Sequence, residues 1–119
     1  MILIKLGTVF ALLSVVIGAF GAHSFENIIS NKMDVFKTAI QYQMFHSLAL
    51  IITGLISITT KLDLMAIGYL FFIGILLFSG SLYIIAIFKI SKFGMVAPIG
   101  GLSFIMGWIL LIYKIRSLH

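Results

Sequence analysis

The stretch LMAIGYLFFIGILLFSGSLYIIAIF, from Leu64 to Phe88, contains 25 residues and no charged side chain. A helix rises about 1.5 Å per residue, so roughly 20 apolar residues cross the hydrocarbon core of a membrane. Three other uncharged runs are as long as this requires: residues 6–25, 38–60 and 93–113, with 20, 23 and 21 residues. The pattern predicts four membrane-spanning helices.

The composition of the whole chain agrees with a membrane protein. Of its 119 residues, 62% are hydrophobic and 9% are charged, and the mean hydropathy is +1.27. A soluble domain carries about a quarter charged residues. We therefore expect one all-α integral membrane domain over residues 1–119, a polytopic four-helix bundle. The expected spans are about 3–22, 38–60, 64–88 and 93–113.

The first uncharged run has a second possible interpretation. It follows Lys5 and ends in small residues near Ala19–Gly21, which is also the pattern of a secretory signal peptide. We interpret it as the first span.

The chain has no cysteine, which excludes disulfides and thiolate metal sites. Its formal net charge of +5 comes from basic residues placed singly or in pairs at span ends, which is typical of headgroup contacts and not of nucleic-acid binding.

The segment SFENIISNKMDVFK, residues 24–37, joins the first two spans and has its own periodicity. Apolar residues recur in it at helical spacing, with polar residues between them, and Ser24 is placed as an N-cap. The apolar set is Phe25, Ile28, Ile29, Met33 and Phe36. We predict a short amphipathic helix over about 25–37 that lies on the membrane surface. The alternative is an irregular loop.

Polar residues gather at one depth when the chain is folded back and forth. We call the end that holds both termini the N-side and the opposite end the loop side. Counted from the loop side, His46 of the second span and Ser79 and Ser81 of the third share a layer about 10–14 Å deep. One face of the second span should point into the bundle: Ala39, Gln43, His46, Ala49, Thr53 and Ser57.

Small residues form stripes on the first and last spans. The first stripe comprises Gly7, Ala11, Ser14, Gly18 and Ala22; the second comprises Gly94, Ala97, Gly100, Ser103 and Gly107. Such stripes let helix backbones approach closely in lipid. The predicted close-packing positions are Gly18, Gly21, Gly80, Pro98, Gly100 and Gly101. Trp108 and Tyr113, near the end of the last span, are expected to be interfacial anchors.

The polar side chains allow two hypotheses. They could be interhelical links, with Gln43 and His46 bonded to Ser79, Ser81 or a carbonyl freed near Pro98, where the helix is expected to kink. They could instead line a polar pocket of a small transporter or ligand-binding protein. The candidate set is His23, Gln43, His46, Ser79, Ser81 and Tyr83. His23 and His46 with Met44 or Met95 make a weak metal site, so we expect no metal and no cofactor. Without an acidic residue in any span, catalysis is not expected.

Four short motifs give the chain a family resemblance. They are GAFGAH at 18–23, YQMFH at 42–46, FSGSLY at 78–83, and APIGG with GW at 97–108. In this order they resemble the small bacterial membrane proteins grouped as domain of unknown function 423, to which the eukaryotic transmembrane protein 256 is similar. The resemblance covers essentially the whole chain. It implies a four-span protein of the plasma membrane and no particular activity.

The function expected from these features is structural. Within the expected spans, close-packing glycines outnumber charged and histidine side chains, which favours a non-enzymatic protein that supports membrane integrity or a partner complex. The expected partners are membrane lipids and a further copy of the chain or another membrane protein, and not nucleic acid.

The two ends of the bundle carry equal numbers of basic residues: Lys5, Lys61, Lys114 and Arg116 against Lys32, Lys37, Lys89 and Lys92. The short connection near Lys61 and the C-terminal bases favour both termini in the cytoplasm.

Overall fold

The computed structural model describes residues 1–24 and 26–118. In this part of the chain, four long apolar helical segments are able to cross a membrane, as predicted. The first is α1 (Ile2–Val16) with η1 (Ile17–Gly21), and the second is α4 (Met33–Thr60). The third is α5 (Met65–Gly74), η3 (Ile75–Ser79) and α6 (Gly80–Phe88), and the fourth is η4 (Ser91–Met95) with α7 (Ala97–Ile115).

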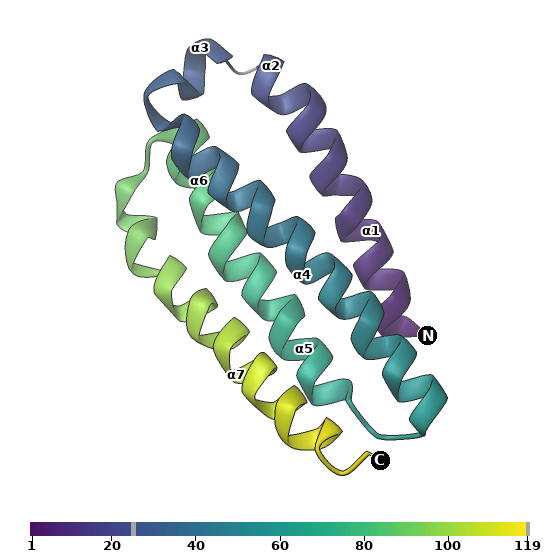
Figure 1. The fold of residues 1–119 in the computed structure, drawn as a ribbon. Helices are drawn as coiled ribbons and strands as arrows, with labels where there is room; N and C mark the ends of the chain where they lie inside the picture. Colours follow the sequence, from purple (N-terminus) through teal and green to yellow (C-terminus); the bar gives the residue numbers. More distant parts are fainter. Residues whose placement is uncertain (25, 119) are drawn as a thin grey trace.

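The four spans run up and down (Figure 1). Both termini and the connection from α4 to α5 lie at one end, which is the N-side. The segment from α2 (Ala22–Ser24) to η2 (Ser30–Lys32) and the connection after α6 lie at the other end. The alternation follows from the short connections, since neighbouring spans joined by a few residues must run antiparallel.

The segment between the first two spans is helical but shorter than the sequence suggests. It contains α2, α3 (Glu26–Ile29) and the 3-10 turn η2, and residues 33–37 already belong to α4. The turn at η2 separates α3 from α4. On either side of it, Ile29 and Phe36 are buried and pack with Ala86 of α6 in a small core of their own. Phe25 lies outside the described residues. Ser24, which we expected as an N-cap, is instead the last residue of α2.

Glycines bring the spans together below the polar layer. A Cβ atom added to Gly7 would lie 2.6 Å from the carbonyl oxygen of Ser47, so α1 and α4 are in backbone contact there. The side chain of Ile4 packs over Gly54 of α4, and the side chain of Leu3 packs over Gly68 of α5. Gly7 is thus a member of the first stripe that lies in close contact, with Ser47 and Ile51 of α4, while Gly54 and Gly68 are close-packed glycines that neither stripe included.

The fourth span begins differently from the expectation. We predicted that Pro98 would kink a helix starting near Phe93, but α7 begins at Ala97 and Pro98 stands in its first turn. The first turn tolerates proline because its N–H groups have no partner within the helix. The carbonyl oxygen of Val96, just before α7, accepts from the N–H groups of Ile99 and Gly100.

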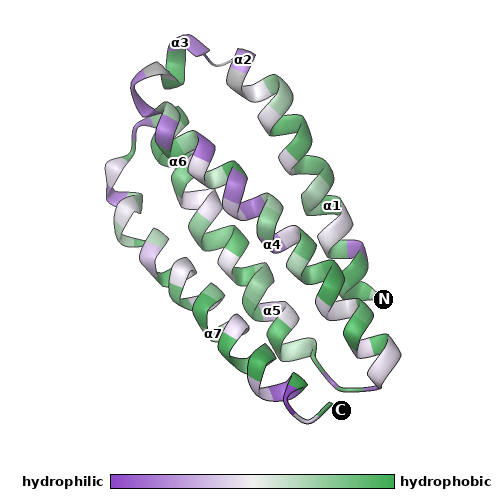
Figure 2. Cartoon of the chain, viewed as in Figure 1, coloured by the Kyte–Doolittle hydropathy of each residue, from purple (hydrophilic) through white to green (hydrophobic). Residues whose placement is uncertain are grey.

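The surface of the bundle matches a lipid environment. Large apolar side chains such as Leu12, Phe45 and Leu102 are more than half exposed. In Figure 2, hydrophilic colour gathers at the loop-side end, at the chain ends and in the loop-side half of α4, while the remaining helix surface is mostly hydrophobic. Polarity is therefore concentrated in one half of the bundle, as the depth of the polar residues predicted.

Candidate functional site

The inward face of α4 carries the polar layer. Five of its six predicted residues are buried, namely Ala39, Gln43, His46, Ala49 and Thr53, and Ser57 is half-buried. Gln43 and His46 lie three residues apart, so their side chains point about 60° apart around the helix. Each of them therefore meets a different neighbouring span.

Gln43 connects three spans. Its Nε2 donates to the carbonyl oxygen of Phe10 in α1 over 2.9 Å, and the hydroxyl of Tyr83 in α6 donates to its Oε1 over 2.6 Å. The amide thus uses its oxygen and one N–H in bonds to other helices. These bonds fix the rotation of α1 and of α6 relative to α4. Neither serine that we expected as a partner takes part.

His46 connects α4 to α7 through Trp108. The indole Nε1 donates to Nε2 of His46 over 3.0 Å, and Nδ1 of His46 lies 2.9 Å from the carbonyl oxygen of Tyr42. Our prediction that Trp108 anchors the chain at the interface is wrong, because this side chain is half-buried against α4. Tyr113, in contrast, is exposed near the N-side end of α7, with the guanidinium of Arg116 4.4 Å from its ring centroid.

Aromatic rings enclose the imidazole of His46. The ring of Phe104 stacks on it with the centroids 3.6 Å apart and the planes 11° from parallel. Phe71 and Trp108 lie at 5.7 and 5.8 Å, and only 4% of His46 is exposed. The enclosure keeps lipid and water from the imidazole on these sides, which strengthens its two hydrogen bonds.

The predicted serines bond to backbone carbonyls. The Ser79 hydroxyl donates to the carbonyl oxygen of Ala39 over 2.8 Å, which ties the third span to α4. Ser81 donates to Leu77 within its own helix. Ser103 of α7 makes an interhelical bond of 2.6 Å to the carbonyl oxygen of Leu70, a role that we did not predict. The sequence signal for Ser103 was its place in the second stripe of small residues.

Only some of the predicted packing positions are tight. A Cβ atom on Gly100 would lie 2.3 Å from the backbone nitrogen of Phe78, whereas one on Gly101 would be 3.8 Å from the Phe78 ring, an ordinary contact. Gly18 has ordinary contacts with Ile40, and nothing lies within 4 Å of such an atom on Gly80. Gly21 is buried, while Pro98 is exposed. Gly100 is thus the closest approach of α7 to the third span.

His23 does not join the polar layer. It belongs to α2 at the loop-side end and is exposed, whereas His46 is buried in the bundle. Within residues 1–24 and 26–118, no group of three or more His, Asp or Glu side chains is placed to hold a metal ion.

Residues 17–101 match the family described as "Protein of unknown function (DUF423)". The chain belongs to this family. It is 50% identical over 110 residues to a UPF0382 membrane protein of Staphylococcus haemolyticus, covering 92% of this chain and 90% of that relative. It is 42% identical over 120 residues to the UPF0382 membrane protein YwdK of Bacillus subtilis, covering 93% of each. No solved structure matches the chain.

The DUF423 match covers only part of the two hydrogen-bonded groups. Gln43, His46 and Tyr83 lie within residues 17–101, whereas Phe10 and Trp108 lie outside them. The relatives are described as membrane proteins, which agrees with the four candidate spans. The chain is therefore a multi-pass membrane protein whose polar groups meet in the middle of one half of the bundle.

Proposed function

We propose that this protein is a non-enzymatic structural protein of the bacterial cell membrane, which supports membrane integrity or holds a partner complex together. One observation carries the proposal: three polar side chains of the layer are used in bonds between the protein's own helices. Gln43 and His46 each bridge α4 to another span, and Ser79 adds a third bridge.

The state of His46 argues against transport. A residue that carries protons or binds a passing ligand needs a free nitrogen and a path to it. Both ring nitrogens of His46 already have partners, and the ring is covered by Phe104. A layer held by bonds between helices is more useful to a scaffold that must hold a fixed shape than to a carrier that must change conformation.

The alternative function is a small transporter or ligand-binding protein. It is supported by a hollow of about 370 Å³ between α4 and α7, to which His46 contributes together with Tyr42, Phe45 and Trp108. Its size falls within the usual range for ligand pockets, roughly 300–1,000 Å³. The imidazole edge that meets this hollow is nevertheless almost closed, since His46 is 4% exposed.

We also propose that the protein performs no catalysis. The hydroxyls of Ser79 and Ser81 donate to backbone carbonyls and not to His46, so neither is activated as a nucleophile. The acidic residue of α4, Asp34, is exposed at the loop-side end and lies twelve residues from His46, too far to orient the imidazole. Both termini are proposed to face the cytoplasm.

The structural and transport functions are separable by one pair of measurements. The protein is reconstituted in vesicles with an entrapped pH dye, and in parallel its assembly state is followed in native membranes by blue native electrophoresis. The structural function predicts no proton flux above empty vesicles and a discrete band larger than the monomer. His46→Leu should reduce this band, and the matched change His23→Leu should not.

Two results would overturn the proposal. One is a proton flux that His46→Leu abolishes while the folded protein remains in the vesicles, which would establish transport. The other is a monomeric band in native membranes that neither substitution changes, provided that membrane vesicles prepared from cells lacking the protein are also no leakier than those from cells that contain it.

A further inference from the structure

We propose that a groove in the loop-side half of the bundle binds one acyl chain of an anionic phospholipid. The groove, called here the leaflet groove, lies between the first and third spans. It consists of two hollows of about 440 and 190 Å³. Ile17 and Tyr83 line both hollows, which therefore adjoin. The inference goes beyond the function proposed above and does not depend on it.

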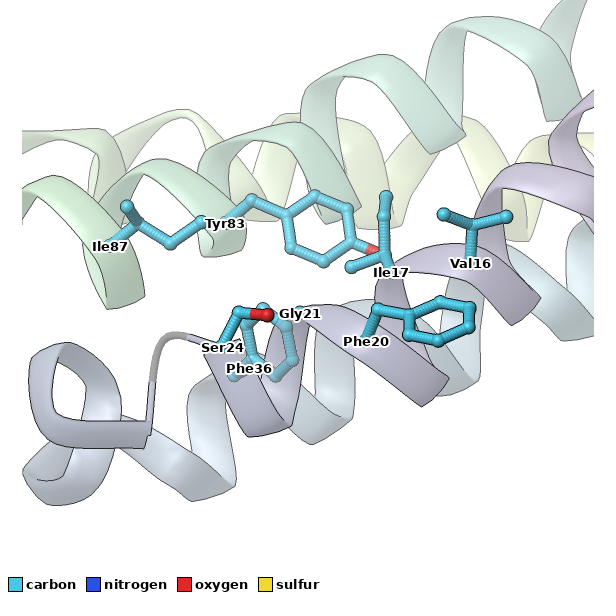
Figure 3. A pocket seen from close by; sticks show the side chains of 8 residues that line it. All are labelled: Val16, Ile17, Phe20, Gly21, Ser24, Phe36, Tyr83 and Ile87. Carbon is cyan, nitrogen blue, oxygen red and sulfur yellow. The ribbon is translucent and has the colours of Figure 1, made fainter.

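The walls of the leaflet groove are apolar. Figure 3 shows Val16, Ile17 and Phe20 on one side and Tyr83 and Ile87 of α6 across from them. The Tyr83 hydroxyl does not add a free polar group, because it donates to Gln43. Gln43 and Ser79, which line the inner hollow, also make hydrogen bonds within the protein, so a hydrocarbon chain would displace none of these bonds.

The length of the leaflet groove matches one leaflet. Its third-span wall runs from Ile87 to Ile75, which is 12 residues or about 18 Å at the rise of a helix. One leaflet has a hydrocarbon depth of about 15 Å, half the thickness of the bilayer core. The groove therefore begins at the loop-side interface and ends near the middle of the membrane.

Aromatic and aliphatic side chains close the groove at that depth. The rings of Phe10 and Phe72 meet with their centroids 5.6 Å apart, just below the inner hollow. Closer to the N-side, the side chain of Leu3 occupies the space over Gly68. The first and third spans are thus in contact through the N-side leaflet and apart through the loop-side leaflet.

This shape distinguishes a lipid chain from a partner helix. A transmembrane helix crosses both leaflets and would need a surface that continues past Phe10 and Phe72. An acyl chain enters from its own headgroup and ends at the midplane, which is the form of the leaflet groove. The lipid must therefore belong to the loop-side leaflet.

The charges at the loop-side end of the bundle favour an anionic headgroup. Ser24 lines the loop-side end of the groove, and Lys89 follows Ile87 by two residues. The exposed charged side chains of this end are Lys32, Lys37, Lys89 and Lys92 against Glu26 and Asp34. Lys89 is held in place by its bond of 2.8 Å to Oδ1 of Asn31. A phosphate there meets a net positive surface and a hydroxyl donor.

The test is native mass spectrometry of the full-length protein, released from vesicles of equal phosphatidylglycerol and phosphatidylethanolamine. We expect one phosphatidylglycerol retained per chain. Val16→Trp, which fills the groove, should abolish retention, while Ile109→Trp on the lipid-facing side of α7 should not. Lys89→Gln should reduce the preference for phosphatidylglycerol about fivefold, the factor expected for one basic residue at a membrane surface.

Two matched variants isolate the role of the charge. Asn31→Ala breaks the link to Lys89 but keeps the charge, and Lys114→Gln removes a charge at the opposite end; both should retain the lipid. Thermal unfolding of each variant shows whether it is folded. Equal retention of the two lipids, or equal loss in Val16→Trp and Ile109→Trp, would mean that lipid binds nonspecifically around the bundle and would overturn the proposal.

Discussion

The indole N–H of Trp108 donates to Nε2 of His46, which fixes the tautomer of the imidazole. Indole nitrogen only donates, so Nε2 must accept, and the proton lies on Nδ1, which faces the carbonyl oxygen of Tyr42. The histidine therefore links the carbonyl of Tyr42 in α4 to the indole N–H of Trp108 in α7. A replacement would need both a donor and an acceptor to keep the two bonds.

Trp108→Phe should destabilise the bundle, because it removes the donor and keeps most of the aromatic packing. Hydrogen bonds between membrane helices are worth about 0.6 kcal/mol on average and rarely more than about 1.7. We expect a loss of about 1 kcal/mol in the free energy of unfolding in detergent. A double-mutant cycle with His46→Leu should give a coupling energy of the same size. No coupling would show that the two rings only pack.

Gln43→Leu should cost more than Tyr83→Phe. The first change removes two interhelical bonds, to α1 and from α6, while the second removes one. We expect losses of about 1–3 kcal/mol and about 0.5–1.5 kcal/mol in the free energy of unfolding. Chemical denaturation in detergent measures the free energy of unfolding of both variants. If Tyr83→Phe were the worse of the two, the bond from Gln43 to Phe10 would contribute nothing.

The sequence predicted the spans and the buried face of α4, but not the partners of Gln43 and His46. The spans follow from the length of the uncharged runs, and the buried face follows from the helical period of apolar residues. Both can be recognised within a single segment. Partners depend on how helices rotate against one another. The carbonyl of Phe10 carries no sequence signal, because every residue has one. Trp108 was misassigned since depth alone suggested an anchor, whereas its direction around α7 places it beside His46.

Gly100→Ala should be harmful and Gly101→Ala should not. The added methyl group at Gly100 would overlap the backbone of Phe78, which cannot move aside as a side chain can. Overpacking of this kind costs about 1–3 kcal/mol. At Gly101 the methyl group makes only ordinary contacts, and alanine favours a helix over glycine by about 1 kcal/mol. Thermal unfolding of the two neighbours should thus shift in opposite directions, and a Gly101→Ala variant as unstable as Gly100→Ala would contradict the structure.

The two glycines also show which sequence criterion was the better guide. Both glycines were predicted as close-packing positions, but the stripe of small residues contained only Gly100. Adjacent residues of a helix differ by about 100° in direction, so only one of them faces a neighbour. Direction therefore decides close packing, and Gly94, a stripe member outside α7, makes no contact of this kind.

Thr53→Val should leave stability unchanged or raise it. Within the described residues, the buried Oγ1 of Thr53 has no hydrogen-bond partner, and valine replaces the hydroxyl with a methyl group of similar size. An unsatisfied buried polar group costs about 1–3 kcal/mol. Ser79→Ala is the control, since the Ser79 hydroxyl is bonded to Ala39 and its removal should lower stability. A clear loss in Thr53→Val, measured as above, would show that this hydroxyl has a role of its own.

The orientation of the bundle is the last testable point. Each end carries four Lys or Arg residues, so the charge bias that normally sets orientation is balanced. We expect both termini in the cytoplasm, because the N-side holds the short connection with Lys61 and the C-terminal pair Lys114 and Arg116. The chain has no cysteine, so a single one at Asn27 or at Ser117, both exposed, reports on one end alone. An impermeant thiol reagent should label Asn27→Cys in intact cells, and Ser117→Cys only after permeabilisation. The opposite result reverses the orientation, and half labelling of both would establish copies inserted in both directions.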